Sequence, residues 1–182
     1  SIDCISTPFD ETAVDLLEEI GAPFYKIASF EVTDLPLIKY IASKKKPIIM
    51  STGMADKEEI GEALEAIKSE GVKDILILHC VSGYPTPVDQ INLQTINLLR
   101  DTFNVDVGLS DHTLGNVSSV MSIAYGVKVI EKHYTLRRSD GGPDAAFSME
   151  PEELSVLSKD IQDAFQARGD ASFERKLVEK SN

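Results

Sequence analysis

The sequence contains no tryptophan, only two cysteines and only three histidines in 182 residues. It also lacks a signal-peptide pattern and any apolar run of membrane-spanning length, so we expect no membrane partner. Two cysteines cannot build a disulfide framework. Cys4 and Cys80 both fall in predicted strands, where we expect buried free thiols. Together these features predict a cytoplasmic protein of a reducing compartment.

Positive charge is also scarce. Lysine and arginine total 18, against 30 acidic residues, which gives a net charge of −12. A surface this acidic repels phosphate backbones, so we expect no nucleic-acid partner, and an anionic substrate would need a local basic pocket. The hydrophobic content of 42% and the length of the chain suit one globular domain with a single core.

Short apolar, β-branched segments alternate with helix-like segments along the chain. Strands are predicted at residues 2–8, 24–29, 47–53, 75–80, 105–113 and 127–135. Helices are predicted at residues 10–20, 34–41, 56–70, 92–100, 116–126 and 151–167. Such alternation predicts an α/β fold in which crossover helices join parallel strands. We expect one domain over residues 1–168 and a polar tail over residues 169–182.

The ends of the predicted strands help to distinguish two parallel-sheet architectures. Nearly every strand ends in serine, threonine, lysine or histidine. A (β/α)₈ barrel collects catalytic groups from the ends of many strands, whereas an open sheet concentrates them at one switch point. We therefore predict a TIM barrel, incomplete because the chain has about six βα units. The sequence has no glycine-rich dinucleotide-binding motif and no P-loop.

Two of the histidines end consecutive predicted strands. His112 and His133 are separated by a single helix-like segment. Strands joined in this way are usually neighbours in a parallel sheet, so both side chains should point into one pocket. They could bind a divalent metal there, although two ordinary strand-end histidines would give the same pattern. His79 lies in the middle of a strand, and we expect it in the core.

An anion site is predicted at the same end of the strands. Lys26 lies in an otherwise apolar strand and would need an anionic partner. Four serines at strand ends could donate hydrogen bonds to phosphate or carboxylate oxygens, although each alone is unremarkable: Ser29, Ser51, Ser82 and Ser110. Glu31 follows the second strand, where it could act as a general base or be a solvated loop acid.

Six short motifs occur in order along the chain. They are Lys26-Ile-Ala-Ser-Phe-Glu31, Ser51-Thr-Gly-Met54, Tyr84-Pro-Thr-Pro87, Gly108-Leu-Ser-Asp-His-Thr113, Glu131-Lys-His133 and Gly142-Pro-Asp144. This set resembles the sialic acid synthase family, which condenses phosphoenolpyruvate with an N-acetylated amino sugar. Within the family, the first and last motifs most resemble pseudaminic acid synthases. N-acetylneuraminate synthases more often have asparagine where this chain has Ser82.

The resemblance implies a TIM barrel and a role for individual residues. His112 and His133 would bind a divalent metal, with Mn²⁺ first and Mg²⁺ or Co²⁺ as alternatives. The phosphoenolpyruvate site would comprise Thr7, Lys26, Ser29, Ser51, Ser82 and Ser110. Tyr84 and Asp144 would contact the sugar, and Glu31 would assist proton transfer. The catalytic candidates are therefore Glu31, Lys26 and His112.

Two alternatives remain open at this point. A different metal-dependent barrel aldolase, acting on sugar phosphates, would need no phosphoenolpyruvate. The chain could also be an inactive fragment, because relative to the family it lacks two βα units and the C-terminal domain. Its edge strands would then be unpaired, so we expect this chain alone to be inactive and to form homo-oligomers or pair with the missing part.

Overall fold

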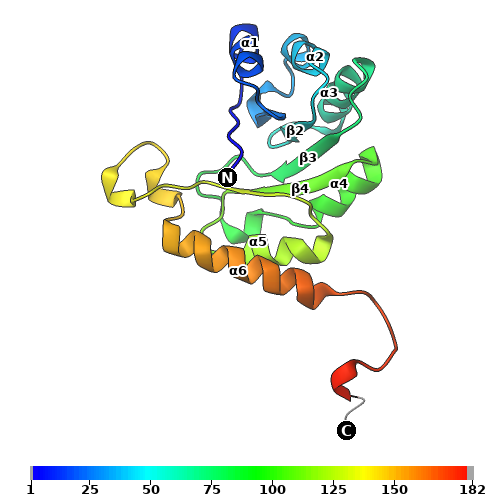
Figure 1. The fold of residues 1–182 in the computed structure, drawn as a ribbon, viewed down its shortest axis with the longest axis vertical. Helices are drawn as coiled ribbons and strands as arrows, with labels where there is room; N and C mark the ends of the chain where they lie inside the picture. The colour runs from blue at the N-terminus through cyan, green and yellow to red at the C-terminus, as the bar shows by residue number, and fades with distance from the viewer. Residues whose placement is uncertain (1, 180–182) are drawn as a thin grey trace.

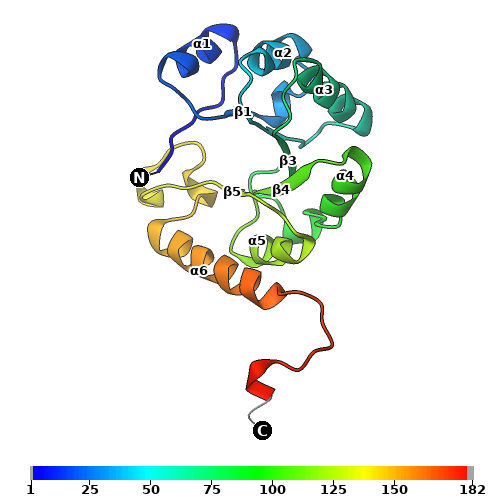
Figure 2. The same ribbon diagram turned by 45° about the vertical axis from the view of Figure 1, so that its right-hand side comes forward.

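The computed structural model describes residues 2–179 and contains one parallel sheet with the strand order β1-β2-β3-β4-β5. The strands are β1 (Tyr25–Ile27), β2 (Ile48–Ser51), β3 (Ile75–Cys80), β4 (Asp106–Asp111) and β5 (Ile130–Lys132). The helices are α1 (Glu11–Glu19), α2 (Leu35–Ser43), α3 (Lys57–Ser69), α4 (Thr95–Phe103), α5 (Val117–Ser122) and α6 (Pro151–Arg168). The helices form an outer arc around the strands, which gives the outline of part of a barrel (Figure 2). Beyond α6, the chain runs away from this body as an exposed segment (Figure 1).

The first predicted strand is absent. Residues 2–8 have no regular secondary structure, and none of the five strands pairs with them. A β-branched segment forms a stable strand only beside a neighbour that completes its hydrogen bonds, and no described strand does so here. Cys4 is consequently exposed, so its predicted burial is wrong, whereas Cys80 is buried as predicted. The expectation of about six βα units is therefore corrected to five strands and six α-helices within residues 2–179.

Side-chain caps explain where several helices begin. The carboxylate of Asp10 accepts a hydrogen bond from the Ala13 backbone N–H at 2.8 Å, and Asp56 forms a capping box at the start of α3. Each cap satisfies a backbone donor that the first helical turn leaves unpaired. Helix α4 begins later than the predicted residue 92, because Asn92 has a left-handed backbone with φ of 47°.

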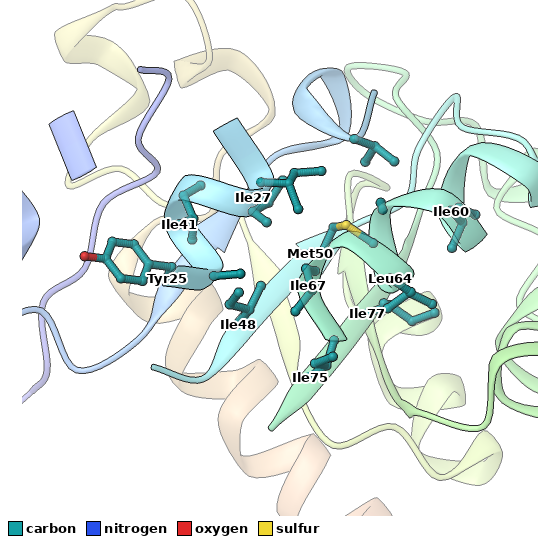
Figure 3. Packing of buried hydrophobic residues seen from close by; sticks show 14 of the residues in the cluster. Tyr25, Ile27, Ile41, Ile48, Met50, Ile60, Leu64, Ile67, Ile75 and Ile77 are labelled. Atoms are coloured by element: carbon teal, nitrogen blue, oxygen red, sulfur yellow. The ribbon is translucent and has the colours of Figure 1, made fainter. Parts of the chain in front are cut away.

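The two faces of the sheet differ because successive strand residues point to opposite sides. The face toward the helices is apolar over most of the sheet, and its buried apolar members are Tyr25, Ile27, Ile48, Met50, Ile75, Ile77, Val107 and Leu109. They pack against α2 and α3 through residues such as Ile41, Ile60 and Ile67 (Figure 3). His79 also lies on this side, 5% exposed, with its Nε2 atom 2.6 Å from the Ile91 carbonyl oxygen, which confirms its core position. The alternate residues form the concave face, which carries the polar groups described below.

One ion pair shows how strongly the sheet curls. Lys26 in β1 and Glu131 in β5 belong to opposite edge strands, yet Lys26 Nζ lies 3.6 Å from Glu131 Oε2. In a flat sheet with strands about 4.8 Å apart, β1 and β5 would be separated by about 19 Å. The contact therefore requires the two edges to curve toward each other, as strands do in a TIM barrel. Within residues 2–179, no helix has the length and apolar character needed to span a bilayer.

Candidate functional site

The two histidines lie together at the carboxyl ends of β4 and β5. Each follows the last paired residue of its strand, and the ring centroids of His112 and His133 are 5.2 Å apart. Tyr84, from the loop after β3, lies 4.4 Å from the His112 ring and 5.7 Å from the His133 ring, measured between centroids. Asp144 reaches the same group, with its Oδ2 atom 3.5 Å from His133 Nδ1. The order of the strands therefore brings both imidazoles into one cluster.

The hydrogen bonds of the rings leave nitrogen atoms that could bind a metal. His112 Nδ1 donates to the Val81 carbonyl oxygen at 2.9 Å, so Nε2 carries the lone pair of the neutral ring. Its nearest partner is Ser110 Oγ, at 3.4 Å. Two imidazoles suit a divalent ion whose other ligands are water or substrate oxygens. Among the described residues, no group of three or more His, Cys, Asp or Glu side chains is arranged to hold a metal.

The pKa values of the two histidines shift in opposite directions. Burial lowers the pKa of His133, and the neighbouring His112 lowers it further. Burial also disfavours the charged form of His112, but contacts with the Cys80 thiol and the Val81 carbonyl outweigh it and raise the pKa of His112. The neutral form is therefore favoured at His133, whereas a metal at His112 would compete with a more tightly held proton.

Lys26 is the centre of a polar cluster on the concave face. The residue is 8% exposed, and its Nζ atom donates to Ser51 Oγ at 2.8 Å and to the Ile27 carbonyl oxygen at 3.3 Å. Ser110 Oγ donates to Glu131 Oε1 at 2.6 Å, and Glu131 forms the ion pair with Lys26. A buried ammonium group needs such partners. The cluster therefore combines one ammonium group and two hydroxyl groups with the Glu131 carboxylate, and an anion that binds there would compete with Glu131 for these donors.

Ser29 and Ser82 extend this cluster around a glycine. The Gly53 backbone N–H donates to Ser29 Oγ at 3.1 Å. A Cβ atom on Gly53 would lie 2.5 Å from Ser82 Oγ and 3.0 Å from both Cys80 Sγ and Ser29 Oγ, so the three side chains require a glycine here. Ser82 Oγ is buried and has no hydrogen-bond partner among the described residues. A buried hydroxyl group in that position is suited to meet a substrate oxygen.

Glu31 has the environment of a proton-transfer group. It ends the 3₁₀ turn (Ser29–Glu31) after β1, and its buried Oε2 atom finds no hydrogen-bond partner within the described part of the chain. Burial raises the pKa of Glu31, and the positive charge of Lys26 only partly offsets this shift. A carboxyl group whose pKa moves toward neutrality is better able to exchange protons at physiological pH.

One predicted site residue is not brought to the cluster. Thr7 lies in the irregular segment before α1, and no hydrogen bond of the described residues joins it to the groups on the concave face. The segment has no strand partner that would fix it against the sheet. The structure assembles the other predicted residues around the concave face, although Tyr84 and Asp144 are exposed at its rim.

Sequence reasoning missed two members of the site. Glu131 precedes His133 by two positions, and Cys80 precedes Ser82 by two positions, so each shares the concave face with its predicted neighbour. Alternation within the strands could therefore have identified both. Cys80 Sγ lies 3.9 Å from His112 Nδ1. Burial opposes ionisation of the thiol, but the contact with His112 outweighs it and lowers the pKa of Cys80.

Comparison with known proteins gives one consistent family. The NeuB family model matches residues 1–173. N,N'-diacetyllegionaminic acid synthase from Campylobacter jejuni is 45% identical over 180 residues, covering 98% of this chain and 54% of the relative. Pseudaminic acid synthase from Campylobacter jejuni is 40% identical over 171 residues, covering 94% of this chain and 50% of the relative.

A solved structure supports the same relationship. N-acetylneuraminic acid synthetase from Leptospira borgpetersenii, crystallised with citrate, aligns with a TM-score of 0.89 and 33% identity. The alignment covers 96% of this chain and 61% of that chain, and this chain spans about half the length of the curated relatives above. Because the family model matches nearly all of it, the chain belongs to the NeuB family of sialic acid synthases.

Proposed function

We propose that the protein carrying this chain condenses phosphoenolpyruvate with an N-acetylated amino sugar, forming a nonulosonic acid and phosphate. One observation carries the proposal: a buried lysine, hydrogen-bonded to the Ser51 hydroxyl group, lies on the same concave face as two adjacent imidazoles. Condensation of an anionic phosphoester with a carbonyl compound needs both an anion site and a means of polarising the carbonyl. The names of the relatives support this reaction class.

Phosphoenolpyruvate would bind around Lys26. The ammonium group would offset charge on the phosphate or carboxylate, and the serine hydroxyls would donate hydrogen bonds to its oxygens. These serines are Ser29, Ser51, Ser82 and Ser110. Thr7 remains a proposed member of this site, although its contact would require the segment before α1 to lie closer to the sheet.

His112 and His133 are the residues that would hold a divalent ion, with Mn²⁺ as the first choice and Mg²⁺ or Co²⁺ as alternatives. When bound, such an ion supplies Lewis-acid polarisation of the open-chain sugar aldehyde. The sugar would lie against Tyr84 and Asp144, whose side chains adjoin the His133 ring. This placement would bring the aldehyde carbon near the anion site.

The bond changes follow from the chemistry of the two substrates. The alkene carbon of phosphoenolpyruvate attacks the sugar aldehyde, and a new C–C bond forms. Water then adds to the resulting oxocarbenium carbon, and phosphate leaves as its C–O bond breaks. Glu31, whose pKa is raised by burial, would accept the proton released by that water.

For the sugar, we propose the pseudaminic acid precursor first. The motif that begins at Lys26 and the loop that contains Asp144 favour it. A legionaminic acid precursor is the second candidate, because the legionaminic relative is 45% identical and the pseudaminic relative 40%. An N-acetylneuraminate precursor is the third.

Phosphate release by the full-length protein tests the reaction. Phosphoenolpyruvate and each of several N-acetylated hexosamines are mixed with the protein and a divalent metal salt. Released phosphate is quantified, and the mass of the acidic sugar product is measured by mass spectrometry. We expect phosphate release only when both substrates are present, and the sugar that supports it fastest identifies the substrate. Cleavage of sugar phosphates without phosphoenolpyruvate would instead favour a barrel aldolase. We expect no activity from this 182-residue chain alone.

A further inference from the structure

A second polar network lies on the helix-facing side of the sheet, directly behind the two histidines. Asp111 and Lys132 are the last residues paired between β4 and β5, and Lys132 Nζ lies 3.2 Å from Asp111 Oδ2. Their side chains are 0% and 7% exposed, respectively. The proposed reaction uses neither group, although each immediately precedes one of the histidines.

Asp111 fixes the backbone on both sides of His112. Its Oδ1 atom accepts hydrogen bonds from the Thr113 backbone N–H at 2.8 Å and from Thr113 Oγ1 at 2.7 Å. Its Oδ2 atom accepts a hydrogen bond from Ser119 Oγ in α5 at 2.5 Å. The carboxylate therefore closes a turn around His112 and ties that turn to the helix behind it.

Lys132 connects the same turn to β5. Besides the ion pair, its Nζ atom donates to the Thr113 carbonyl oxygen at 2.6 Å and to the Gly115 carbonyl oxygen at 3.3 Å. The β4–β5 ladder ends at the Asp111–Lys132 pair, so the histidines lie one residue beyond the last paired position. One ammonium group thus joins the segment that follows β4 to the residue that precedes His133.

We propose that the buried Asp111–Lys132 pair is a positioning device that sets the separation of His112 and His133, so that both can hold one divalent cation. Stability alone does not explain a charged pair in this layer, where neighbouring strand residues are apolar, because buried ion pairs contribute little more than apolar replacements. Directed hydrogen bonds from a fixed carboxylate and a fixed ammonium group do orient backbone segments. The inference rests on the proposed function, since that function is what requires the shared cation.

Removing the charges of both Asp111 and Lys132 distinguishes a role in positioning the histidines from a role in stabilising the fold. In the full-length protein, Asp111→Asn combined with Lys132→Met leaves side chains of similar size without an unpaired buried charge. We expect this double variant to unfold cooperatively in urea, while its Mn²⁺ affinity, measured by electron paramagnetic resonance, falls about 10- to 100-fold, as for other residues that orient metal ligands. Lys46→Met is the matched control, because it breaks an ion pair between the loop that precedes β2 and Glu18 of α1 and should leave Mn²⁺ affinity unchanged.

A milder pair of variants keeps the test valid if the double variant does not fold. Ser119→Ala removes one hydrogen bond to Asp111, whereas Ser122→Ala removes a hydroxyl group that donates to the Ser119 carbonyl oxygen and not to Asp111. We expect a severalfold loss of Mn²⁺ affinity in the first variant and none in the second.

If Ser119→Ala, or a folded double variant, binds Mn²⁺ as tightly as the wild type, the positioning role of Asp111 and Lys132 is overturned. The proposed reaction would remain intact. A wild-type protein that binds no divalent cation would also overturn the inference, and phosphate release would then decide separately on the reaction.

Discussion

Replacement of Lys26 by methionine removes the single buried positive charge of the proposed phosphoenolpyruvate site but keeps most of the side-chain volume. The folded chain should tolerate the change, because Glu131 keeps its bond to Ser110 and its side chain is 42% exposed, so water can replace the lost ammonium group. We expect a stability cost of about 1–3 kcal/mol, because the change leaves the buried Ser51 Oγ and the Ile27 carbonyl oxygen without their donor. A charge-assisted contact to the substrate is worth about 1.5–3 kcal/mol, which corresponds to about a 10- to 100-fold loss in kcat/KM for phosphoenolpyruvate.

Steady-state phosphate release by the full-length Lys26→Met protein measures this loss, with the amino sugar held at saturation. The matched control is Lys44→Met, which breaks an ion pair with Asp15 on the outer helices. This control should retain the wild-type value of kcat/KM. Wild-type kinetics for phosphoenolpyruvate in Lys26→Met would refute the assignment of Lys26 to the anion site, whatever the effect on stability.

Three further predictions concern the fold and its charges. Burial raises the pKa of Glu31 above its ordinary value of 4.5, so the stability contributed by its protonated form is present below that value and lost as pH rises through the raised value. Glu31→Gln should therefore raise the free energy of unfolding by about 1 kcal/mol near pH 7 but leave it unchanged near pH 4. Urea denaturation at the two pH values measures this difference, and an equal change in the free energy of unfolding at both would contradict the prediction. Gly108→Ala should destabilise the protein by about 1–3 kcal/mol, because the new Cβ atom would lie 2.5 Å from the Val129 carbonyl oxygen. The control Gly61→Ala in α3 should be stabilising, because its Cβ atom meets no such clash. A higher melting temperature for Gly108→Ala than for Gly61→Ala would exclude the clash. Light scattering of the isolated 182-residue chain should show homo-oligomers, since β1 and β5 each have only one strand partner in the described sheet, and a monomer with a cooperative melt would contradict that expectation.

Much of the architecture could be predicted from the sequence because the governing signals are local. The strands β2 and β3 are short, largely apolar runs, and α1 and α3 have apolar stripes and begin at the side-chain caps Asp10 and Asp56. Because parallel strands joined by one helix are usually neighbours, chain order was enough to place His112 beside His133.

The features that sequence reasoning missed depend on contacts between distant segments. Residues 2–8 have the composition of a strand, but strand formation also requires a neighbour, which composition does not reveal. The pairing of Lys26 with Glu131 depends on the curl of the whole sheet. The ion pair between Asp111 and Lys132 likewise depends on the register of β4 against β5, which no local pattern specifies.

The fate of one oxygen atom tests the proposed condensation most directly. Phosphoenolpyruvate that carries oxygen-18 in the bridge between carbon and phosphorus is incubated with the full-length protein, the amino sugar and a divalent metal. The proposed reaction breaks the C–O bond, so we predict that the released phosphate contains the label and that the acidic sugar product does not. Label retained in the organic product would mean that the P–O bond breaks instead, which would contradict the mechanism proposed for this site.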